Sequence, residues 1–157
     1  TIIQSNSTLL MSLITLFISS MFLQTSSSTS ENIWKNKLTH SLDFKSITKE
    51  EKTQKVIFFT YKNMKYSHLS DWETITFVTK KEIEQFRSDV QEAIPKRGNP
   101  TKLNWERDKY TLSIGGSGLS KWNLWITAKS GKYTAIGKPK VLRNLSTALN
   151  LAVSKMD

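Results

Sequence analysis

The hydrophobic pattern of this chain changes from that of strands to that of a helix, and this order limits the folds it can adopt. Residues 55–62 and 71–79 are rich in β-branched and aromatic side chains, as strands are. In residues 79–95 the apolar positions recur at helical spacing, and Thr79 begins a Thr-x-x-Glu capping box. Pro95 ends this predicted helix.

The second half of the sequence repeats the order. Strands are predicted at about 102–106, 109–114, 121–129 and 132–137. Residues 141–153 then carry apolar side chains at helical spacing. The sequence therefore predicts an α+β fold in which antiparallel sheets are each backed by an amphipathic helix, in the order strands, helix, strands, helix.

Two weaker signals bear on this organisation. The segment SHLSDW at 67–72 resembles SGLSKW at 117–122, which suggests two related units packed as a pseudo-dimer. Thr48 and Glu51 also have the spacing of a capping box, which predicts a short helix there.

The N-terminal part of the chain is apolar. Residues 9–23 contain only apolar side chains, Ser and Thr, and a run of this length suits a secretory signal better than a full membrane span of ~20 residues. No Lys or Arg precedes it, so a short anchor and a helix packed into a larger assembly remain alternatives. We divide the chain into a hydrophobic segment with a Ser/Thr-rich spacer, 1–30, and a basic α+β domain, 31–157. An organellar, exported or membrane-associated location follows if 9–23 is a signal or an anchor.

Positive charge is concentrated towards the C-terminus. The net charge is +10, and residues 95–157 hold 12 Lys and Arg against 3 acidic residues, whereas residues 31–94 hold 11 against 10. No acidic residue occurs between Lys109 and Met156. A surface of one sign suggests an anionic partner, such as a phosphate backbone, an acidic lipid surface or an acidic protein. The alternative is a basic surface that serves solubility alone.

Residues suited to catalysis are scarce. The chain has no cysteine, which excludes disulfides, thiolate zinc sites and cysteine nucleophiles. His40 and His68 have no partners at the spacing of a metal site or a catalytic triad, and we expect both at the surface. The run GGSG at 115–118 lacks the flanking residues of a nucleophile elbow or a phosphate loop. We therefore expect a protein that is not an enzyme and has no metal or cofactor.

Strand alternation places Trp125 opposite the core. The core face of its strand holds Trp122, Leu124, Ile126 and Ala128, continued on the neighbouring strand by Tyr110, Leu112 and Ile114. The outward face is expected to contain no acidic residue and to collect Lys109, Thr111, Ser113, Lys121, Asn123, Thr127, Lys129, Lys132 and Thr134. An aromatic ring on a basic face can stack on an unpaired base while lysines hold the backbone. The alternative is that the N-terminal half or a partner protein covers Trp125.

The last predicted helix begins with cations. Lys138, Lys140 and Arg143 oppose the helix dipole unless an anion lies between them. Pro139 suits the first helical position and leaves free N–H groups to meet a phosphate. The alternative is a solvated helix end, where the repulsion costs only ~0.3–1 kcal/mol per charge.

Two hypotheses of function follow. The first is a non-enzymatic protein that binds RNA or single-stranded DNA through the backbone. In it Trp125 stacks on a base, and phosphates are neutralised by Lys109, Lys121, Lys129, Lys132, Lys138, Lys140 and Arg143. The second is a membrane-tethered or exported interaction module, or an accessory subunit of a multi-subunit assembly, whose basic face meets acidic lipid or an acidic protein.

Overall fold

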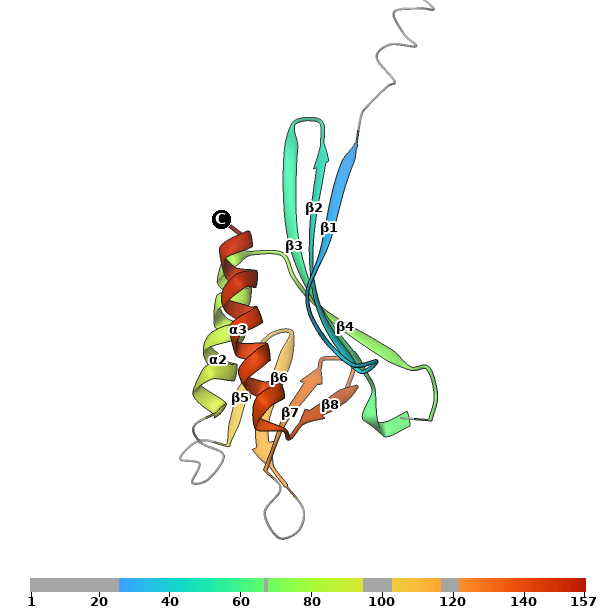
Figure 1. Cartoon of the computed structure of the whole chain (residues 1–157), viewed down its shortest axis with the longest axis vertical. Coiled ribbons are helices and arrows are strands. Elements are labelled where there is room, and N and C mark those ends of the chain that lie inside the picture. Colours follow the sequence, from blue (N-terminus) through green and yellow to red (C-terminus); the bar gives the residue numbers. More distant parts are fainter. Residues whose placement is uncertain (1–25, 67, 95–102, 117–121) are drawn as a thin grey trace, which may run out of the picture.

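The computed structural model of the chain describes residues 26–66, 68–94, 103–116 and 122–157. It contains two four-stranded antiparallel sheets, each followed along the chain by one long helix (Figure 1). The predicted α+β class and the order of strands, helix, strands, helix are confirmed.

The first sheet has the strand order β1-β2-β3-β4. Its strands are β1 (Ser27–Asn36), β2 (His40–Lys49), β3 (Lys52–Lys62) and β4 (Trp72–Phe77). A short 3-10 helix, η1 (Met64–Tyr66), follows β3. In Figure 1 the ends of β1, β2 and β3 extend as a ribbon beyond the helices.

The short helix predicted at Thr48–Glu51 is wrong, because this segment turns the chain from β2 into β3. Lys49 pairs with Lys52, and the two residues between them, Glu50 and Glu51, have φ angles of 51° and 63°. A two-residue hairpin loop of this kind requires positive φ at both central residues. The residues after Thr48 and Glu51 do not carry apolar side chains at helical spacing. The capping-box spacing alone was therefore not enough to predict a helix.

The second sheet has the order β5-β6-β7-β8. Its strands are β5 (Asn104–Glu106), β6 (Tyr110–Gly115), β7 (Asn123–Ala128) and β8 (Tyr133–Ile136). The sequence echo does not mark equivalent places in the two units. Trp72 begins β4, the fourth strand of the first sheet, whereas Trp122 precedes β7, the third strand of the second.

The two helices are α2 (Lys80–Ala93) and α3 (Pro139–Lys155), and they pack against each other. The capping box of α2 forms as predicted, with Thr79 as N-cap and Glu82 closing it. The helices cover the sheets crosswise: α3 contacts β1 and β2 of the first sheet, and α2 contacts β6 of the second as well as β4.

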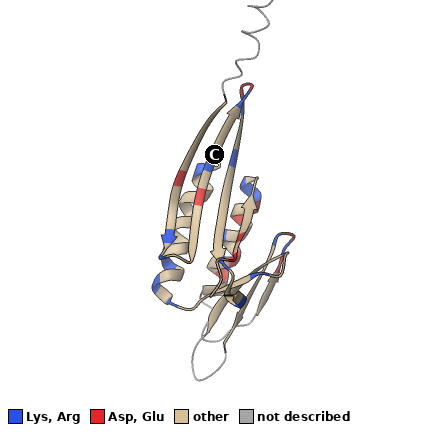
Figure 2. Cartoon of the chain, turned by 90° about the vertical axis from the view of Figure 1, so that its right-hand side faces the viewer, with Lys and Arg blue, Asp and Glu red and all other residues tan. Residues whose placement is uncertain are grey.

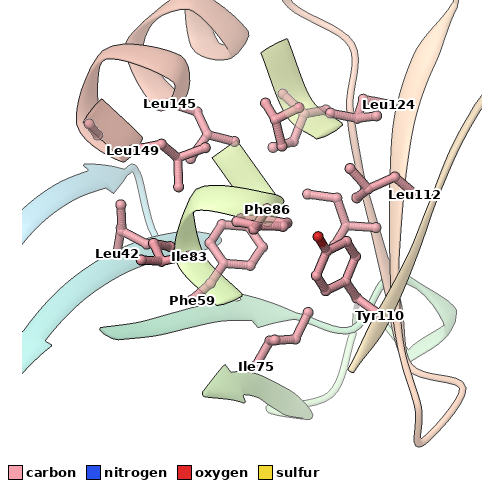
Figure 3. Packing of buried hydrophobic residues seen from close by; sticks show 14 of the residues in the cluster. Leu42, Phe59, Ile75, Ile83, Phe86, Tyr110, Leu112, Leu124, Leu145 and Leu149 are labelled. Atoms are coloured by element: carbon pink, nitrogen blue, oxygen red, sulfur yellow. The ribbon is translucent and has the colours of Figure 1, made fainter. Parts of the chain in front are cut away.

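One hydrophobic core joins both sheets and both helices. Phe86 of α2 lies at its centre (Figure 3), with ring centroids 5.0 Å from Phe77 and 4.9 Å from Tyr110. Leu145 and Leu149 of α3 close the core from the other helix. The inward positions predicted on β6 and β7 are all buried or packed against this core.

The predicted hydrophobic segment, residues 9–23, lies outside the described residues. β1 begins at Ser27, so the last residues of the expected spacer pair with β2. Within the described ranges, neither helix combines the length and the apolar character needed to cross a membrane.

Candidate nucleic-acid interface

Trp125 lies on the outer face of the second sheet, away from the core. It is partly buried beside Tyr133, with the two ring centroids 5.7 Å apart. Its indole Nε1 donates a hydrogen bond to the Gly115 carbonyl at 3.2 Å. Tyr133 lies on the same face. Its cross-strand partner is Thr127, which follows Trp125 by two residues on β7 and therefore points to the same side of the sheet. The structure therefore forms an aromatic pair where the sequence indicated a single ring.

Three features of this face differ from the prediction. Thr134 is buried, with 1% of its surface exposed, because it pairs with the core residue Ile126. Glu106 pairs with Thr111 and so adds an acidic residue to a face expected to have none. Lys109 reaches away from the face, since its Nζ lies 2.8 Å from the Glu82 carboxylate and 2.7 Å from the Thr76 carbonyl oxygen.

Lys132 is also engaged inside the molecule. Its Nζ lies 2.7 Å from Asp71 Oδ1, and this contact raises the pKa of Lys132. The same hydrogen bond, together with one from Asn63, lowers the pKa of Asp71. The carboxyl group of Glu82 behaves similarly: burial acts to raise its pKa, but hydrogen bonds from Lys109 and from backbone N–H groups lower it overall. Two of the predicted phosphate-binding lysines thus have acidic partners.

The other predicted cations fall at two places. Lys129 is exposed at the turn between β7 and β8, whereas Lys138, Lys140 and Arg143 are exposed at the start of α3, beyond the other end of β8. Lys121 lies outside the described residues. The structure therefore does not gather the predicted set into one patch.

A pocket of about 400 Å³ opens at the start of α3. Three lysines from separate elements line it: Lys37 from the β1–β2 turn, Lys62 from the end of β3, and Lys138. None of the described lining residues is acidic. Pro139 occupies the first turn of α3, and no side chain caps the helix at Lys138. Cations and uncapped N–H groups at one cavity form a site suited to a phosphate. We call it the α3 pocket.

His40 lies in the wall of the α3 pocket and is not the surface residue that we expected. It is 7% exposed, and its Nδ1 and Nε2 lie 2.8 Å and 2.7 Å from the hydroxyls of Thr39 and Thr134. Burial lowers its pKa to about 4, so the ring is neutral at pH 7. The positive charge of the pocket at neutral pH therefore comes from its lysines.

The α3 pocket adjoins the aromatic pair. Ala135 lines the pocket and is the direct cross-strand partner of Trp125. Side chains at such paired positions have Cβ atoms about 5 Å apart. Met64, also in the pocket wall, accepts a hydrogen bond on its sulfur from the Ala135 N–H at 3.0 Å. A cationic cavity and an aromatic platform thus lie side by side.

Lys37 and Lys62 are not predicted from the sequence, because residues 31–94 are nearly neutral as a whole. Alternation along 55–62 did place Lys62 opposite the buried Tyr61, which is a signal of its outward position. Lys37 has a φ of 50° in the β1–β2 turn, and nothing in the sequence near it indicates its approach to α3.

Comparison of the chain with family models, curated proteins and solved structures finds no match.

Proposed function

We propose that this protein is a non-enzymatic nucleic-acid-binding protein that holds a single strand of RNA or DNA. The observation that carries the proposal is the α3 pocket with its three lysines, next to the Trp125–Tyr133 pair. The pocket would take a backbone phosphate, and the rings would take the face of a neighbouring base. Such a combination of cations and aromatic platforms is typical of single-strand binding sites.

A single strand fits this arrangement better than a duplex. In a duplex the bases are stacked on one another, so a ring on a sheet face has no free base to contact, whereas an unpaired base offers one. The aromatic side chains would provide affinity for any base, because every base has a π-face. We expect little sequence preference.

The cations divide into three groups under this proposal. Phosphate contacts come chiefly from the α3 pocket and its rim: Lys37, Lys62, Lys138, Lys140 and Arg143. Lys129 would extend the contact along the second sheet, and Lys121, predicted for the same role, lies outside the described residues. Lys109 and Lys132 contribute less, because Glu82 and Asp71 already neutralise them.

The test is a titration of the full chain against a dye-labelled, single-stranded oligonucleotide of about 12 nucleotides, within the ~4–16 nucleotides that single-strand sites span. Fluorescence anisotropy is followed at several salt concentrations. A double variant, Lys62→Ser with Lys138→Ser, should bind at least about 10-fold more weakly and show a shallower salt dependence, by ~0.7 in log–log slope per lost contact. Trp125→Leu should weaken binding without changing the slope.

Lys81→Ser is the matched control, because Lys81 is exposed on α2 and belongs to neither the pocket nor the aromatic face. It should bind nearly as the wild type does. Absence of oligonucleotide binding at low salt would overturn the proposal. If vesicles rich in phosphatidylserine then bound the chain, the membrane-associated hypothesis would replace it.

A further inference from the structure

The outer face of the first sheet carries a second surface with basic and aromatic side chains. Figure 2 looks onto this sheet with the helices behind it. Cross-strand pairing and alternation assign to this face Lys35, Ser41, Asp43, Lys45, Phe58, Thr60, Lys62, Trp72 and Thr74. Asp43 is the one acidic residue of this set, and its two carboxylate oxygens accept hydrogen bonds from Asn32 and Ser41, each at 2.7 Å.

Trp72 is the most exposed tryptophan among the described residues, at 44%. It lines a hollow of about 530 Å³ together with Lys35, Ser41 and Asp43. At this exposure part of the ring is open to a ligand. Lys35 beside the ring provides a partner for the phosphate of a nucleotide whose base stacks on the ring, while the Ser41 hydroxyl donates to Asp43. We call this hollow the Trp72 hollow.

Lys62 links the two sites. It lines the α3 pocket, and on β3 it is the direct cross-strand partner of Trp72. A phosphate held by Lys62 would therefore lie one cross-strand step from the Trp72 ring. The α3 pocket therefore adjoins the Trp125–Tyr133 pair through Ala135 and the Trp72 hollow through Lys62.

We propose that a single strand continues from the α3 pocket onto the first sheet, where Trp72 stacks on a base and Lys35 contacts a phosphate. This inference rests on the proposed function and deepens it, because it makes the site extend over both sheets. A polyanion is the occupant that the charges favour, since Lys35, Lys45 and Lys62 face only one carboxylate on this surface.

The experiment compares two dye-labelled oligothymidylates, of about 4 and about 12 nucleotides, with the full chain. The shorter one can occupy the α3 pocket and one aromatic platform, whereas the longer one can reach both sheets. The variants are Trp72→Leu, which keeps an apolar side chain but removes the π-face, Trp72→Phe, which keeps a ring, and Lys35→Ser. Urea unfolding of each variant shows that the fold is retained.

For the longer oligonucleotide, Trp72→Leu should raise the Kd about 5- to 150-fold, the range for loss of one stacked base. Trp72→Phe should restore most of this affinity, and Lys35→Ser should lower the salt slope by ~0.7. Affinity for the shorter oligonucleotide should change by less than about 2-fold in all three variants.

The possible failures differ. If both oligonucleotides bind but Trp72→Leu leaves the longer one unaffected, the extension over the first sheet is overturned and the proposed function stands. If Trp72→Leu and Trp72→Phe weaken both lengths equally, Trp72 belongs to the α3 pocket site and the extended path is again overturned. If neither oligonucleotide binds, the proposed function and this inference fail together. Binding of polyglutamate in place of either oligonucleotide would then identify an acidic protein as the partner.

Discussion

Arg107 donates two hydrogen bonds to the carboxylate of Asp89, from Nε to Oδ2 and from Nη2 to Oδ1, each 2.8 Å long. Asp89 lies on α2 and is 1% exposed, while Arg107 lies in the turn between β5 and β6. The hydroxyl of Tyr110 donates a third hydrogen bond to Asp89 at 2.9 Å, and Gln85 donates a fourth at 3.0 Å. This buried cluster fixes α2 to the second sheet.

Asp89→Asn should therefore destabilise the protein strongly. Losing one partner of a buried ion pair costs ~3–5 kcal/mol, and the partial exposure of Arg107 places this case near the lower end. The measurement is the urea concentration at the midpoint of unfolding. Asp108→Asn, at an exposed neighbour of Arg107, is the control and should change the stability by less than about 0.5 kcal/mol. Equal midpoints for the two variants would contradict a stabilising role of the cluster.

The lowered pKa of His40 leads to a prediction of how the stability of the protein depends on pH. Its folded-state pKa of about 4 lies below the ordinary value of 6.5, so between these values the unfolded chain binds a proton that the folded chain does not. The contribution of His40 to the stability is therefore fully present above pH 6.5 and is lost as the pH is lowered towards 4. The shift corresponds to about 3 kcal/mol in total.

The measurement for His40 is urea unfolding at pH 7 and at pH 4.5, in the wild type, His40→Gln and His68→Gln. His68 is exposed, so its variant should keep the full pH dependence. The loss of stability on acidification should be clearly smaller in His40→Gln. The same slope in all three proteins would assign the pH dependence to other groups.

The parts of the fold that the sequence predicted are those with local signals. The helix α2 follows from its capping box and apolar stripe, and the inward faces of β6 and β7 follow from alternation. Alternation could not predict which residues of β8 face the core. The apolar residues Tyr133 and Ile136 are three positions apart, so they lie on opposite faces of the strand and only one of them can face the core. Ile136 joins the core, and the hydrogen bond between Thr134 and His40 holds Thr134 on the same side.

The candidate site was harder to predict, because it depends on contacts between distant residues. Asp71 lies 61 residues before Lys132 in the sequence, and only the packing of the two sheets brings them together. Lys37, Lys62 and Lys138 likewise meet only in the folded chain. A count of charges along the sequence could locate the basic C-terminal part but could not separate paired lysines from free ones.

Asp71→Asn should increase the affinity for a single-stranded oligonucleotide. The substitution keeps the shape of the side chain and removes the charge that neutralises Lys132, whose Nζ lies 3.3 Å from the Trp72 carbonyl oxygen, so Lys132 becomes available to a phosphate. An increase of about 2- to 5-fold is expected from one added contact of ~0.5–1 kcal/mol, with a salt slope steeper by ~0.7.

Glu84→Gln is the matched control for this effect. It adds the same unit of net charge, but Glu84 lies on α2 beside Lys80, away from the pocket and the aromatic residues. If net charge alone governs binding, the two variants will gain affinity equally. A larger gain for Asp71→Asn would show that the local position of Lys132 matters.

Lys138→Ser should change stability and binding in opposite directions. Lys138 occupies the N-cap of α3 and makes no side-chain cap, whereas Thr79 caps α2. A serine at this position would accept a hydrogen bond from a free N–H group of the first turn and remove a cation from the positive end of the helix dipole. Both effects stabilise the folded state, by about 1 kcal/mol together. Loss of the lysine should at the same time weaken oligonucleotide binding.

Measuring both stability and oligonucleotide affinity in Lys138→Ser shows whether Lys138 binds a phosphate or is only an unfavourable charge that the helix tolerates. If Lys138 is merely a solvated helix end, Lys138→Ser will raise the unfolding midpoint in urea and leave the affinity for the oligonucleotide unchanged. If Lys138 serves a phosphate, the more stable variant will bind several-fold more weakly. Thr79→Ala provides the comparison at the other helix, because it removes a formed cap and should lower the stability by about 1 kcal/mol without affecting affinity. A stability gain coupled to a loss of binding at Lys138 alone would indicate that α3 begins without a cap because its first turn is reserved for an anion.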